Sequence, residues 1–354
     1  MGAITRTAVI LTWLVIAMTL LAGAGPRANG ARRGGARANA ELLQSLPAPV
    51  RRTIQIELAN GVFDDVTRTN GDDGEVIYDV DFTRAGKPRN LTVALDGRLL
   101  DMLVYLPETP APVREALNSL GGGAELGDIT KNFGLNEDAT YDADIMRDGT
   151  TRTYTVDEAG VLVQMQVFPA EAPLPVQNAI KTATGTGVIG DITKYIDEDG
   201  VTYEVSLARD GKNRTFAVNT NGELVERQVF QDEIPDGVQK AIETQAARGR
   251  LGKINQFTDE GKDYYEVEVH VGANTLRVTF TADGKLDSED EEMALATIPS
   301  LVKTALRPLE TLTEVITDIT RTSEGTNTTY DIELRDGKSR RTITFDAEGK
   351  TVSP

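Results

Sequence analysis

Apolar and polar residues alternate along five short stretches of this chain, and each stretch carries a tyrosine followed by an acidic residue. Successive tyrosines of these stretches are separated by 63, 62, 62 and 65 residues. A nearly constant spacing with matched flanks indicates five copies of one structural unit. The five phrases are Tyr78-Asp79-Val80, Tyr141-Asp142-Ala143, Tyr203-Glu204-Val205, Tyr265-Glu266-Val267 and Tyr330-Asp331-Ile332.

Ahead of each tyrosine stretch, apolar residues four positions apart predict a short amphipathic helix, as with Val113 and Leu117. A β-branched phrase such as Asp128-Ile129-Thr130 then predicts a strand before the tyrosine strand. Turn signals such as Asp148-Gly149 and Ala159-Gly160 predict further strands joined by hairpins. The pattern therefore predicts an α+β fold of tandem repeats, each one helix packed on a three- to four-stranded antiparallel meander sheet.

Aligning the repeats divides most of the chain into five units. A unit of about 60 residues buries only about 60% of its unfolded surface and is marginal alone. The connectors between units are short, so we expect neighbouring units to contact and stabilise each other, as in other tandem arrays. The predicted units are residues 46–107, 108–170, 171–231, 232–294 and 295–354.

The first residues are typical of an export signal. Arg6 precedes an apolar run from Ala8 to Ala22, and Ala22-Gly23-Ala24 is a small-residue cleavage site. We predict a signal peptide over residues 1–24 and a flexible Gly/Ala/Arg linker over residues 25–45. An uncleaved anchor is the alternative, although the run is shorter than the roughly 20 apolar residues of a membrane span. The mature protein is expected to be secreted or periplasmic, with no membrane association after cleavage.

Composition narrows the classes of partner. The chain has no cysteine, which excludes disulfides and thiolate metal sites. It has 55 acidic and 37 basic residues, a formal net charge of −18. Five of the basic residues and none of the acidic ones lie within residues 1–40, so the remainder carries a net charge of about −23. A protein with this much negative charge repels nucleic-acid phosphates and suits a partner with a basic surface.

The acidic residues that alternate with the tyrosine-strand core positions are candidate binding residues. By strand alternation they lie on the sheet face opposite the core. An aligned acidic stripe suits a basic protein partner or weak binding of divalent cations. A solvated sheet face is the alternative, because antiparallel sheets commonly have one polar face. The candidates are Asp79, Asp81, Asp142, Asp144, Glu204, Glu266, Glu268, Asp331 and Glu333.

Catalysis is not indicated. Paired carboxylates on one strand face suit acid–base chemistry, but here they recur in most repeats, whereas an active site is normally unique. His270 is the sole histidine and shares a strand face with Glu266 and Glu268. A single histidine without a repeated partner is more typical of a solvated strand face than of a general base or metal ligand. We therefore predict no enzyme activity, no catalytic residue, no metal site and no cofactor.

The order and spacing of these phrases resemble the PepSY-like domain family, in five tandem copies. The resemblance implies a fold like that of the beta-lactamase inhibitory protein, and a binding or inhibitory role outside the cytoplasm. We therefore predict an exported, non-enzymatic protein-binding repeat array that inhibits a protease or other hydrolase. The alternative is an acidic ion-binding or structural envelope protein. The fullest copy contains Pro173, Val176, Ala179, Ile180, Asp191, Ile192, Thr193, Tyr203, Glu204, Val205, Asp210, Gly211, Lys212, Asn221, Gly222 and Leu224.

Overall fold

A computed structural model describes residues 36–71, 75–134, 139–197, 200–271, 274–307, 315–336 and 339–352. The predicted signal peptide, residues 1–24, lies outside the described residues. The predicted flexible linker, residues 25–45, is described only at its end, where helix α1 (Ala36–Ser45) differs from the expectation of a flexible segment. Leu43 and Leu46 pack against a hydrophobic cluster, and the Asn39 amide donates to the Phe63 carbonyl at 3.0 Å.

Short helices separate groups of strands along the chain. The helices are α2 (Ala48–Leu58), α3 (Ala111–Gly121), α4 (Leu174–Thr184), α5 (Asp236–Gln245) and α6 (Ser300–Leu306), with 3-10 helices η1 (Leu106–Glu108), η2 (Pro169–Glu171) and η3 (Gln231–Glu233). The strands are β1 (Val62–Asn70), β2 (Val76–Arg84), β3 (Lys87–Ala94), β4 (Leu99–Val104), β5 (Glu125–Phe133), β6 (Ala139–Arg147), β7 (Thr150–Asp157), β8 (Leu162–Val167), β9 (Val188–Ile196), β10 (Val201–Arg209), β11 (Lys212–Asn219), β12 (Leu224–Val229), β13 (Arg250–Asp259), β14 (Lys262–Val271), β15 (Asn274–Thr281), β16 (Leu286–Glu292), β17 (Val315–Glu324), β18 (Asn327–Asp336) and β19 (Ser339–Asp346).

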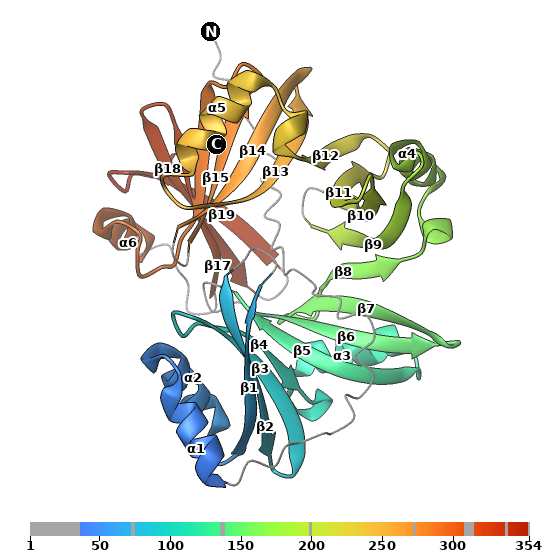
Figure 1. Ribbon diagram of the computed structural model, residues 1–354, viewed down its shortest axis with the longest axis vertical. Helices are drawn as coiled ribbons and strands as arrows, with labels where there is room; N and C mark the ends of the chain where they lie inside the picture. Colours follow the sequence, from blue (N-terminus) through green and yellow to red (C-terminus); the bar gives the residue numbers. More distant parts are fainter. Residues whose placement is uncertain are drawn as a thin grey trace.

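The strands of the described residues form one 19-stranded antiparallel sheet, in which each strand pairs with the next along the chain (Figure 1). The prediction of a separate three- to four-stranded sheet for each repeat is therefore wrong. The reason is that β4, β8, β12 and β16 pair with β5, β9, β13 and β17. Separate sheets would instead leave rows of unpaired backbone groups at their edges.

Helices α2 to α6 pack on one face of this sheet through aliphatic side chains three or four residues apart. On α4, Val176 and Ile180 are buried against Val205 and Phe216. The described residues contain five such hydrophobic clusters, each with one buried tyrosine from the recurring phrase: Tyr78, Tyr141, Tyr203, Tyr265 and Tyr330.

Neighbouring clusters share strands. Val104, at the end of β4, is buried with Val113 and Leu117 of the following helix α3. Val167 and Val229 end β8 and β12 and are buried in the clusters of α4 and α5 in the same way. Burial of these valines therefore couples each part of the chain to the next, in addition to the strand pairing.

Glycines in the second hairpin turn of each strand group lie against the start of a helix. Gly160 has φ +75°, and a Cβ at this position would lie 2.5 Å from the Pro112 carbonyl oxygen at the start of α3. Gly222 has φ +79° and the same relationship to Pro175 of α4. The turn signals in the sequence thus also set how closely each hairpin approaches its helix.

The sheet face away from the helices, termed the polar face, curls back on itself. Arg335 of β18 and Asp157 of β7 both point from this face, and ten strands (β8 to β17) separate them in the meander. Their side chains form an ion pair with 3.3 Å between Arg335 Nη1 and Asp157 Oδ2. The two side chains are only 7% and 5% exposed. Parts of the polar face that are distant in the sheet therefore cover one another.

Candidate functional site

The nine acidic residues predicted from the sequence alternate with buried core residues along β2, β6, β10, β14 and β18. Asp79 and Asp81 are exposed. The other seven are half-buried: Asp142, Asp144, Glu204, Glu266, Glu268, Asp331 and Glu333. These residues therefore do not form one freely exposed stripe, because the polar face curls over most of them.

Neighbouring strands supply hydroxyl and amide donors to many of these carboxylates. Asp142 accepts hydrogen bonds from the Thr155 hydroxyl at 2.6 Å and the Asn132 amide at 2.8 Å. Asp79 accepts one from Thr69 at 2.9 Å. The remaining pairs are Thr153 with Asp144, Thr344 with Asp331 and Thr317 with Glu333. Bonds of this kind satisfy the carboxylates within the sheet and leave them less available to a partner.

Several polar-face carboxyls have pKa values above the ordinary range. Burial raises the pKa of Glu266 to about 7, and it raises the pKa values of Asp142 and Glu204. Burial, reinforced by the nearby Glu266 and Glu204 charges, raises the pKa of Glu226 on β12 to about 7. Loss of water around a carboxylate disfavours its charged form, so this part of the face favours protonation near neutral pH.

The sequence prediction missed four of the buried carboxyls on this face. Burial raises the pKa of Asp101 to about 6 and raises the pKa values of Asp290 and Asp318. Asp101, Glu226, Asp290 and Asp318 lie on β4, β12, β16 and β17, none of which is a tyrosine strand. The period-two alternation of those strands would have placed Asp101 and Glu226 on the polar face, but it could not have predicted their burial.

His270 packs within the sheet. Its Nδ1 lies 3.1 Å from the Thr275 hydroxyl, and its Nε2 lies 3.9 Å from Glu268 Oε2. Its side chain is 12% exposed. A Cβ on Gly252 would lie 2.5 Å from His270 Nε2, so the glycine makes room for the ring. Within the described ranges, no three His, Asp or Glu side chains are arranged to hold a metal ion.

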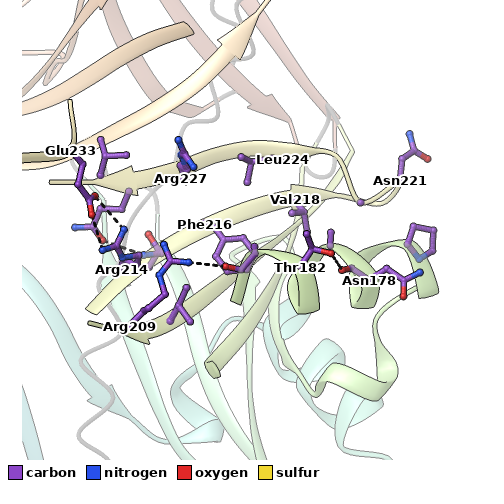
Figure 2. Close-up of a pocket in the computed structure, with 18 residues that line it drawn as sticks. Asn178, Thr182, Arg209, Arg214, Phe216, Val218, Asn221, Leu224, Arg227 and Glu233 are labelled. Atoms are coloured by element: carbon purple, nitrogen blue, oxygen red, sulfur yellow. Dashed lines mark hydrogen bonds and ion pairs between the residues drawn. The ribbon is translucent and has the colours of Figure 1, made fainter. Parts of the chain in front are cut away.

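A groove of about 770 Å³ lies on the other face, between α4 and strands β10 to β12 (Figure 2). We term it the α4 groove. Ala179 and Thr182 line its helix side, and Phe216, Val218 and Leu224 lie along its strand side. Leu224, the first residue of β12, is 51% exposed.

Three arginines line the α4 groove, as Figure 2 shows. Arg214 is paired with Glu233 through two hydrogen bonds of 3.0 and 3.2 Å. Arg209 donates to the Ala183 carbonyl near the end of α4 at 3.2 Å. Arg227 is exposed and donates through Nε and Nη2 to the Gln256 side-chain oxygen at 3.0 and 2.7 Å. A chain with a large excess of acidic residues thus gathers positive charge at this groove.

One register position at the α4 groove differs from its equivalents in the two earlier strand groups. Arg227 on β12 pairs with Phe216 on β11. The equivalent partners in the two earlier strand groups are Met102 with Leu91 and Met165 with Tyr154. Both methionines pack against hydrophobic clusters. Arg227 is instead exposed and bonded to Gln256, because a guanidinium is costly to bury without a partner.

No family model matches the chain, and no curated protein matches it. Solved structures resemble about a third of it. A DUF2874 family protein from Bacteroides ovatus is 15% identical, with a TM-score of 0.31, over 34% of this chain and 86% of that one. A DUF2874 family protein from Bacteroides uniformis is 20% identical, with a TM-score of 0.26, over 32% and 86% of the two chains. A BLIP-like protein from Bacteroides fragilis is 19% identical, with a TM-score of 0.26, over 34% and 84%.

None of the helices in the described part of the chain has the length and apolar character needed to cross a membrane.

Proposed function

We propose that this protein is an exported, non-enzymatic binding protein that uses the α4 groove to hold a segment of a protein partner. The observation that carries the proposal is the groove itself. It has a volume of about 770 Å³ and is lined by apolar side chains together with arginines, amides and hydroxyls. This combination is typical of sites in which apolar contacts give affinity and a few polar groups fix orientation.

Other features of the molecule support binding rather than catalysis. The groove residues include arginines and amides but no histidine, serine or cysteine. His270, the sole histidine of the sequence, lies on the opposite face and contacts Thr275. A nucleophile and a base within hydrogen-bond reach would be needed for acyl transfer or hydrolysis. Export is supported by the apolar run at residues 8–22.

Inhibition of a protease or other hydrolase is the specific form of this proposal. It comes from the PepSY-like order of motifs in the sequence and is an analogy at the level of family. In this form, the partner segment held by the groove belongs to the hydrolase, and binding at the groove lowers its activity.

Two matched substitutions test the groove. Leu224 and Leu286 are the first residues of β12 and β16, pair with core residues Val218 and Phe280, and are 51% and 47% exposed. Leu224→Glu places a charge in the groove, and Leu286→Glu makes the same change outside it. Immobilised wild type and L286E should retain the same extracytoplasmic protein, whereas L224E should lose it.

The retained protein is then purified and titrated calorimetrically against the three forms. Tight binding by wild type and L286E with at least tenfold weaker binding by L224E would support the proposal, since tenfold is about 1.4 kcal/mol. Equal binding by all three forms, or recovery of no protein that depends on Leu224, would overturn it. If the retained protein is a hydrolase, its rate in the presence of wild type and L224E tests the inhibitory form.

A further inference from the structure

Arg227 differs from the other two arginines of the α4 groove in its partners. The Arg214 guanidinium is neutralised by the Glu233 carboxylate, and its side chain is only 10% exposed. Arg209 donates to a main-chain carbonyl and lies 3.9 Å from Asp210. Arg227 is exposed, and its hydrogen bonds within the described residues go to the neutral Gln256 amide oxygen. The guanidinium therefore keeps its full charge for a ligand.

The position of Arg227 ties this charge to the apolar part of the groove. It lies on the same strand face as Val229 and is paired with Phe216, and Leu224 is three residues before it on β12. A ligand that contacts Leu224 is therefore within reach of the guanidinium. Arginine pairs with a carboxylate through two parallel hydrogen bonds, a geometry that a single amide oxygen does not provide.

Building on the proposed function, we propose that the α4 groove recognises an extended acidic segment of its protein partner. A carboxylate of the segment pairs with Arg227, and an adjacent apolar side chain packs on Leu224. Charge complementarity favours this occupant, because the Arg227 guanidinium is exposed and its hydrogen bonds within the described residues go only to a neutral amide oxygen. The net charge of −18 opposes long-range attraction of an acidic partner, so the recognition depends on this short-range contact.

Fluorescence anisotropy with two labelled decapeptides tests the inference on the full chain. One peptide alternates aspartate with leucine, and the other alternates asparagine with leucine. We expect wild type to bind the aspartate peptide about tenfold more tightly than the asparagine peptide, the scale of one charge-assisted pair. Arg227→Gln should abolish this preference. The matched change Arg52→Gln, at an exposed arginine of α2, should leave it intact.

The outcomes separate this inference from the proposed function. Equal affinity of wild type for the two peptides, or failure to bind either one, would overturn the acidic preference. The Leu224-dependent protein retention described above would still stand in that case. Loss of the preference in R52Q as well as R227Q would show a general charge effect and overturn the role of Arg227. Binding of a single-stranded oligonucleotide as tightly as the aspartate peptide would also overturn it.

Discussion

Arg335 and Asp157 form a buried ion pair between β18 and β7, two strands that lie far apart in the meander. Nη1 of Arg335 is 3.3 Å from Asp157 Oδ2, and Nη2 is 3.7 Å from Glu158 Oε2. Asp157 also accepts a hydrogen bond from the Val161 amide at 2.8 Å within its own turn. This contact joins two distant parts of the polar face, so it reports directly on how the long sheet is curled.

We predict that Arg335→Met lowers the stability of the protein by about 2–4 kcal/mol. The change removes the positive charge beside a carboxylate that is itself buried, and uncompensated burial of charge is strongly unfavourable. Urea unfolding followed by circular dichroism measures the effect. Arg68→Met, at an exposed residue of β1, is the control and should change stability by less than about 0.5 kcal/mol. Equal losses in the two variants would contradict the prediction.

We predict that Arg227→Met stabilises the protein by about 1 kcal/mol. Methionine at this position can pack beside Phe216, as the equivalent Met102 packs against the cluster that contains its partner Leu91, and each buried methylene contributes about 0.8 kcal/mol. Arg227→Ala removes the same charge without filling the space, and serves as the control. A thermal midpoint for R227M no higher than that of R227A would show that the groove cannot be filled in this way.

We predict that Gly160→Ala costs about 3 kcal/mol and Gly149→Ala costs about 1 kcal/mol. The two glycines have nearly the same φ, +75° and +76°, so both substitutions carry the strain of a left-handed alanine. A Cβ at Gly160 also meets the Pro112 carbonyl oxygen at 2.5 Å, whereas nothing lies within 4 Å of one at Gly149. Denaturant unfolding of the two variants isolates this contact, and equal destabilisation would mean that it has no energetic weight.

We predict that stability rises as the pH is lowered from 8 to 5. Burial raises the pKa values of Glu226 and Glu266 from 4.5 to about 7, so between these values the folded state binds more protons than the unfolded state. Stability therefore falls as pH rises through this window. The hydrogen bond from Arg89 holds the pKa of Glu108 at about 2, below the pH range from 5 to 8. Glu108 therefore does not titrate in this range.

Thermal midpoints across this pH range test the sign of the effect. Glu226→Gln should raise stability at pH 8 by about 1–3 kcal/mol and flatten the pH dependence, because each unit of pKa shift corresponds to about 1.4 kcal/mol. Glu243→Gln, at an exposed residue of α5, should leave the profile unchanged. A midpoint that falls between pH 8 and pH 5 would contradict the assignment.

Local patterns in the sequence were a reliable guide to local structure. The apolar spacing of Val113 and Leu117 corresponds to the buried side of α3, and the alternation around Tyr265 corresponds to the burial pattern of β14. The separate sheets were mispredicted for a physical reason. Backbone pairing between β4 and β5 has little side-chain signature, because any extended segment carries the same donors and acceptors.

The candidate site was only partly accessible from the sequence. The nine acidic residues could be placed on one sheet face by alternation alone. Their burial could not be predicted, since it depends on contacts such as Arg335 with Asp157 between distant strands. One sequence feature does mark the α4 groove: Arg227 stands where the two earlier strand groups have Met102 and Met165. That signal has meaning only once strand register makes the three positions equivalent.

The sequence by itself determined the short helices, the strand alternation and the turns, because these depend on residues within a few positions of one another. It also determined the negative charge and the absence of thiol chemistry. The tertiary structure decided that the strands join into one sheet, that the sheet curls over its own carboxylates, and that a hollow opens beside Arg227. These properties arise from contacts between residues far apart in the chain, whose energies depend on burial and are not encoded in any local pattern.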